Sequence, residues 1–142
     1  MNAEHAGEAR IRSESDTIAT RRIVRTVGTQ LGFGITDITR IVTAASELAR
    51  NVFLYAGSGI MRWRALDTGG RIGIELTFED SGPGIADVEQ AMQEGYTTGD
   101  GLGMGLPGAK RLMDEFEIAS EIGKGTIVMA KKWHRRLGDS TP

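Results

Sequence analysis

The sequence predicts an α+β fold, with helices packed on one face of a largely antiparallel sheet. Residues up to about Tyr55 carry apolar side chains at helical spacing, whereas later segments alternate between apolar and polar side chains, as strands do. The strand segments come in two pairs joined by short turns, which is typical of antiparallel hairpins. Helices grouped apart from such hairpins favour a two-layer α/β sandwich.

The first half of the chain is expected to contain two long helices. The first spans about residues 15–31, after a weakly indicated edge strand over residues 10–14. The second spans about residues 36–55 and stops at Gly57. Its apolar face comprises Ile38, Ile41, Val42, Ala45, Leu48, Ala49 and Val52.

The second half is expected to form two hairpins. One pairs strands over residues 61–65 and 72–80, and the other pairs strands over residues 116–122 and 125–133, with a turn at residues 123–125. Between the hairpins, a short helical piece near residues 86–93 precedes a helix over residues 107–116. That helix has Pro107 at or near its first position.

The composition is that of one globular domain spanning residues 1–142, with 25% charged and 39% hydrophobic residues. A net charge of −2 argues against a nucleic-acid partner, and no segment approaches the ~20 apolar residues of a membrane span. Because cysteine and an apolar signal segment are both absent, we expect a cytoplasmic protein without disulfides. A solvated basic terminus is expected at Lys131, Lys132, Arg135 and Arg136.

Glycine is about twice as frequent as its average usage of roughly 7%, with 20 glycines in 142 residues. One cluster, at residues 80–84, directly follows an expected strand. There Gly82 and Gly84 let the backbone approach a flat ligand, and Asp80 can accept a hydrogen bond from an amine such as that of adenine. Taken alone, this segment is more often an ordinary turn.

A second glycine cluster, at residues 101–105, precedes the helix expected at Pro107. Alternating glycines expose successive N–H groups, and a helix N-terminus adds the positive end of its dipole, so both favour phosphate. The segment is neither a P-loop nor a dinucleotide fingerprint, and a flexible linker explains it equally well. Thr126 offers a hydroxyl toward a phosphate, although a simple hairpin turn is the default explanation there.

Glu47 and Asn51 lie four residues apart in the second expected helix, so both project from nearly the same face. A carboxylate and an amide at this spacing can place a base beside a metal ligand. An isolated pair of this kind is usually a solvent-facing polar stripe, so the pair gains meaning only from the other motifs.

In order along the chain, the four motifs resemble those of the GHKL ATPases, a superfamily that includes gyrase B, Hsp90, MutL and the histidine kinases. The resemblance covers about residues 11–133 and implies the Bergerat fold, with a mixed, largely antiparallel sheet. Residues 46–51, 54–57 and 101–116 further resemble the RsbT-type switch kinases, which belong to the anti-sigma-factor serine kinases. The four motifs that carry the resemblance to the GHKL ATPases are Glu47-x-x-x-Asn51, Asp80-x-Gly82-x-Gly84, Gly101-x-Gly103-x-Gly105 and Thr126.

This resemblance implies that ATP and Mg²⁺ are the cofactors. It assigns the adenine amine to Asp80, Mg²⁺ to Asn51, and the role of general base or orienting group for the attacking hydroxyl to Glu47. The residues implied in nucleotide binding are Asn51, Asp80, Gly82, Gly84, Gly101, Leu102, Gly103, Met104, Gly105, Leu106 and Thr126.

The resemblance also implies protein partners. Kinases of this type phosphorylate serine in STAS-domain proteins, such as stressosome scaffolds, and then activate a PP2C-type phosphatase. Two other functions stay open: a nucleotide-gated module that holds a sigma factor or phosphatase, which the presence of Glu47 argues against, and a generic ATPase. A histidine kinase is disfavoured because neither His5 nor His134 lies in a helical dimerisation segment.

Overall fold

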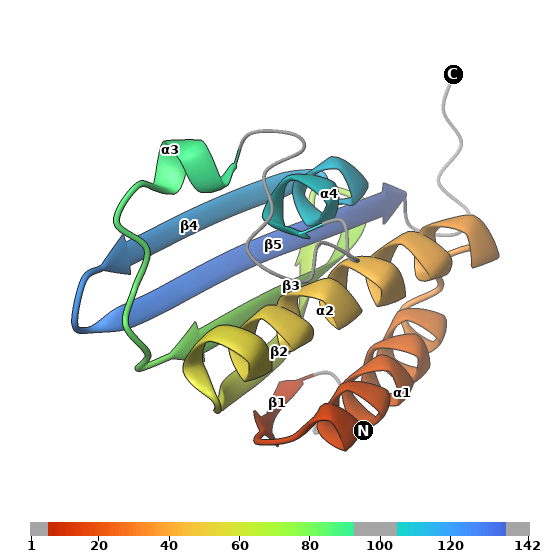
Figure 1. Ribbon diagram of the computed structural model, residues 1–142. Coiled ribbons are helices and arrows are strands. Elements are labelled where there is room, and N and C mark those ends of the chain that lie inside the picture. The colour runs from red at the N-terminus through yellow and green to blue at the C-terminus, as the bar shows by residue number, and fades with distance from the viewer. Residues whose placement is uncertain (1–5, 93–104, 136–142) are drawn as a thin grey trace.

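The computed structural model describes residues 6–92 and 105–135 (Figure 1). The elements are β1 (Ala6–Ile11), α1 (Glu14–Gln30), α2 (Ile35–Ala56), β2 (Gly59–Thr68), β3 (Arg71–Asp80), α3 (Val88–Ala91), α4 (Gly105–Leu112), β4 (Glu115–Glu121) and β5 (Gly125–Arg135). The strands form one sheet in the order β1-β2-β3-β5-β4, and each of these neighbouring pairs is antiparallel. The predicted α+β sandwich with a largely antiparallel sheet is confirmed.

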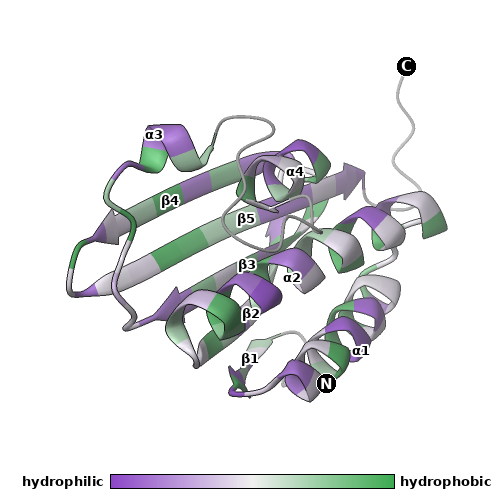
Figure 2. Ribbon diagram, in the orientation of Figure 1, coloured by the Kyte–Doolittle hydropathy of each residue, from purple (hydrophilic) through white to green (hydrophobic). Residues whose placement is uncertain are grey.

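The helices α1, α2 and α4 cover one face of the sheet, with α2 between the other two (Figure 1). The predicted apolar face of α2 is buried except for Ile38, which is half-buried. It packs on the inward residues of β3, of which Ile74, Leu76 and Phe78 are at most 1% exposed. Apolar and polar residues alternate along the strands accordingly (Figure 2).

Several element boundaries differ from the prediction; β2 spans Gly59–Thr68 instead of residues 61–65, and α4 begins at Gly105 instead of near Pro107. The edge strand lies at residues 6–11 instead of 10–14, because α1 already begins at Glu14 and leaves residues 12–13 as a connection. The helix expected to reach Phe116 ends at Leu112, and Phe116 lies in β4. The N–H of Asp114 donates to the carbonyl of Lys131 at 2.9 Å, so sheet pairing takes over directly after the helix.

The face of the sheet away from the helices carries charged pairs. Arg62 lies 3.4 Å from a Glu8 oxygen and 2.8 Å from a Glu79 oxygen, and Arg64 lies 2.6 Å from Glu75. The hydrogen bond with Glu79 raises the pKa of the Arg62 guanidinium above its usual value, and the one with Glu75 does the same for Arg64. No helix within residues 6–92 and 105–135 is long and apolar enough to cross a membrane.

The prediction of a solvated basic terminus is wrong for Lys131 and Lys132. Both lie inside β5, where successive side chains point to opposite faces of the sheet. Lys131 joins the charged face, 3.8 Å from both Glu75 and Glu115, whereas Lys132 points to the helix side and is 7% exposed. Arg136 lies outside the described residues.

Candidate nucleotide-binding site

Asp80 is the last residue of β3 and stands directly opposite Thr126 in the β3–β5 ladder. Its Oδ1 atom accepts the N–H of Gly82 at 2.9 Å, which fixes the orientation of the half-buried carboxylate. Among the described residues, its second oxygen, Oδ2, has no hydrogen-bond partner. A fixed acceptor beside a hydroxyl is therefore available to a ligand at this end of the sheet.

Ser120 of β4 connects this loop to the β4–β5 hairpin, and the motifs in the sequence do not include it. Its Oγ accepts the N–H of Ile85 at 2.7 Å, donates to the carbonyl of Gly125 at 3.1 Å and lies 2.8 Å from Thr126 Oγ1. The N–H of Gly123 donates to the carbonyl of Pro83 at 2.8 Å. A turn at residues 123–125, as expected from the sequence, would place Ile122 opposite Thr126. The turn lies instead at residues 122–124 and pairs Ser120 with Thr126, so no signal in the sequence pointed to Ser120.

The glycines of this region allow protein segments to approach one another closely. A methyl group on Gly82 would lie 2.5 Å from the Cβ of Ala56 in α2, and one on Gly84 would overlap the carbonyl of Glu121. One on Gly125 would overlap the carbonyl of Asp80. The close approach predicted for Gly82 and Gly84 thus serves, in these contacts, to fasten the loop between α2 and the hairpin.

Gly125→Ala should destabilise the protein more than Gly123→Ala. Both glycines have positive φ, 118° and 82°, where a side chain costs about 1–2 kcal/mol. Only Gly125 has backbone in the path of a methyl group, since nothing lies within 4 Å of one on Gly123. We expect urea unfolding to give Gly125→Ala a further loss of about 1–3 kcal/mol. Equal losses would mean that the contact with Asp80 does not constrain the turn.

Glu47 and Asn51 lie one turn apart on α2, and both are half-buried. Glu47 Oε1 accepts the N–H of Gly105, the first residue of α4, at 3.4 Å. The side-chain amide of Asn51 has no hydrogen-bond partner within the part of the chain that is described. The structure therefore brings the predicted base to the start of α4 and leaves the amide, one turn along α2, available to a ligand.

The remaining predicted phosphate residues are only partly described. Gly101, Leu102, Gly103 and Met104 lie outside the described residues. Leu106, in the first turn of α4, packs against the core and is half-buried.

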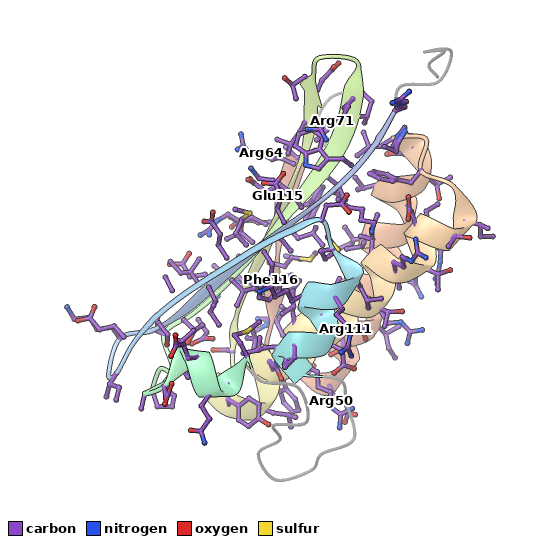
Figure 3. All side chains as sticks on the ribbon, turned by 90° about the horizontal axis from the view of Figure 1, so that it is seen from above. Arg50, Arg64, Arg71, Arg111, Glu115 and Phe116 are labelled. Atoms are coloured by element: carbon purple, nitrogen blue, oxygen red, sulfur yellow. The ribbon has the colours of Figure 1, made fainter. Side chains whose placement is uncertain are left out.

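Arg50 of α2 and Arg111 of α4 lie on the helix side, away from Arg64, Arg71 and Glu115 (Figure 3).

The residues present fit a purine nucleotide and a magnesium ion. The Oδ2 atom of Asp80 and the neighbouring Thr126 hydroxyl suit an exocyclic amine, which presents donors. Within residues 6–92 and 105–135, no three His, Cys, Asp or Glu side chains are grouped to hold a metal. Asn51 as a single ligand suits Mg²⁺, which keeps several waters and binds mainly through phosphate oxygens.

The comparisons with known proteins agree with this geometry. Residues 11–132 match the histidine kinase-like ATPase domain family. The chain is 49% identical over 126 residues to the serine/threonine-protein kinase RsbT of Bacillus subtilis (strain 168), covering 89% of this chain and 95% of that protein. It is 36% identical over 128 residues to the anti-sigma F factor of Thermoanaerobacter sp. (strain X514), covering 86% and 87%.

A solved structure, the RsbU and RsbW domains of Rv1364c from Mycobacterium tuberculosis, has the same fold. Its TM-score is 0.60 at 19% sequence identity, and the match covers 94% of this chain but 35% of that one. The chain belongs to the histidine kinase-like ATPase domain family and, within it, is related to RsbT.

Proposed function

We propose that the protein is an ATP-dependent serine protein kinase that acts in a bacterial partner-switching pathway. The observation that carries the proposal is the contact between Glu47 and the backbone of Gly105. It places a carboxylate at the start of α4, one helical turn along α2 from the side-chain amide of Asn51. The relation to RsbT, named as a serine/threonine-protein kinase, supports the same conclusion.

In this proposal the nucleotide spans the two halves of the site. Asp80 and Thr126 bind the adenine amine, Gly82 and Gly84 hold the loop beneath the base, and residues 101–106 bind the phosphates through backbone N–H groups. Asn51 would hold Mg²⁺, which would supply charge neutralisation at the phosphates when bound.

Glu47 acts as the general base. It accepts the proton of the substrate serine hydroxyl as the serine oxygen bonds to the γ-phosphorus and the bond from that phosphorus to the β–γ bridging oxygen breaks. The products are phosphoserine and ADP. Because phosphoryl transfer depends mainly on positioning and charge neutralisation, the contact between Glu47 and Gly105 supports this role by placing the carboxylate at the start of α4.

The protein partners also form part of the proposal, and they follow from the resemblance of the motifs to the RsbT-type switch kinases. We propose that the acceptor is a serine in a STAS-domain scaffold or antagonist protein, and that the released kinase activates a PP2C-type phosphatase. A sigma factor is a further candidate partner, because the chain is also related to anti-sigma F factors.

The test is to mix the purified protein with Mg²⁺, γ-labelled ATP and STAS-domain proteins from the same genome. We expect label on serine of a STAS protein, and none with Glu47→Ala, as read by phosphopeptide mass spectrometry. ATP binding without label on any acceptor would instead favour the second candidate, a nucleotide-gated binding module. The 36% identity to an anti-sigma F factor is the observation that favours that alternative.

A further inference from the structure

Lys132 is a buried cation far along β5 from the nucleotide end of the sheet. It stands opposite Ile74 in the β3–β5 ladder, on the side that packs against the helices, and is 7% exposed. Ile74 is fully buried. Burying a charge is costly unless it is paired and hydrogen-bonded, so the ammonium of Lys132 needs hydrogen-bond acceptors and counter-charges around it.

The ammonium of Lys132 joins three segments. Nζ donates to the carbonyl of Leu112 at 2.8 Å, and lies 3.5 Å from Asp114 Oδ1 and 3.9 Å from Asp37 Oδ1. Leu112 is the last residue of α4, where carbonyls lack partners within the helix and a cation meets the negative end of the helix dipole. Lys132 therefore fastens the C-terminal end of α4 to β5.

The opposite end of α4 lies at the proposed phosphate site. The helix is eight residues long, or about 12 Å, and its first residue contacts Glu47. Asp37 lies in the first turn of α2, and Glu47 lies in the same helix. In addition to their apolar packing, the helices α2 and α4 are thus linked by polar contacts at two places, by Lys132 at one end and by the contact between Glu47 and Gly105 at the other.

We propose that Lys132 is a positioning residue for the phosphates of ATP. By holding the C-terminal end of α4, it sets where the backbone at Gly105 stands relative to Glu47 and Asn51. The inference rests on the proposed function, since it assumes that ATP phosphates bind at the start of α4. It predicts that losing Lys132 weakens binding of the phosphates but not of the adenosine part.

The experiment compares Lys132→Met with Lys131→Met. The control removes the same charge from the neighbouring position of the same strand, but from the opposite face of the sheet. Binding of Mg²⁺-ATP is measured by calorimetry and binding of adenosine by NMR, after circular dichroism has verified the fold. Lys132→Gln, which retains a hydrogen-bond donor, is measured in parallel so that the test survives if the methionine variant does not fold.

We expect Lys132→Met to weaken ATP binding about ten- to hundredfold, the contribution of one or two displaced hydrogen bonds to phosphate, and to change adenosine binding by less than about twofold. Lys132→Gln should show the same difference to a smaller degree, and Lys131→Met should leave both affinities near wild type. Equal loss of both ligands, or no loss of ATP binding, would overturn the inference. Failure of the wild-type protein to bind ATP would instead overturn the proposed function.

Discussion

Glu47→Gln should reduce phosphoryl transfer by about 10²–10⁴-fold, the range typical for loss of a general base. Glutamine has nearly the shape of glutamate, and its amide oxygen can still accept the N–H of Gly105, to which Glu47 now lies at 3.4 Å. What it cannot do is take up the proton of the attacking hydroxyl. Single-turnover transfer to the STAS acceptor measures the rate, and calorimetry verifies that ATP still binds with near wild-type affinity.

The comparison with Glu47→Ala separates the two roles of this side chain. Alanine removes the base and also the contact with Gly105, so any weakening of ATP binding beyond that of the glutamine variant reports the positioning role. If proton transfer dominates, both variants lose a similar factor in rate. Unimpaired transfer by Glu47→Gln would assign the base to another residue.

The helices and hairpins of this fold are largely predictable because local periodicity and long-range packing agree. The apolar face of α2 is visible in the sequence, and the structure buries it against β3. Prediction is weaker where two elements meet. The sequence gives no sharp stop between α4 and β4, and the end of α4 depends on the pairing of Asp114 with Lys131, a contact between distant parts of the chain.

The motifs in the sequence also predict which side chains come together in part of the site. Asp80 and Thr126 are opposite each other in the ladder, and Glu47 reaches Gly105. Ser120 was missed because serine in a strand is unremarkable until the hairpin register is known. Lys132 was misinterpreted for a similar reason. A pair of lysines near a terminus gives no sign of burial in the sequence, and only the alternation of side chains along β5 places one of them on the helix side.

Asp80→Asn should weaken ATP binding by about ten- to hundredfold, because a hydrogen bond to a charged group contributes about 1.5–3 kcal/mol. The asparagine oxygen can still accept the N–H of Gly82, at 2.9 Å in the wild type, so the loop should keep its shape. Its Nδ2 group then replaces the acceptor Oδ2 with a donor, which would face the donor amine of adenine. Calorimetry with Mg²⁺-ATP measures the loss.

Glu79→Gln is the matched control, because Glu79 precedes Asp80 in β3 but pairs with Arg62 on the charged face. It should leave ATP binding near wild type, because Glu79 lies on the charged face of the sheet. Loss of its exposed ion pair should also cost little stability.

Inosine triphosphate makes the test of Asp80 specific, since it differs from ATP in carrying a carbonyl acceptor where adenine carries the amine. The wild-type carboxylate should strongly prefer ATP, and the donor of Asp80→Asn should reduce or invert that preference. If the variant instead lost affinity for both nucleotides by the same factor, Asp80 would support the loop without recognising the base. Thr126, which stands opposite Asp80 in the ladder, would then be the next candidate for recognising the amine.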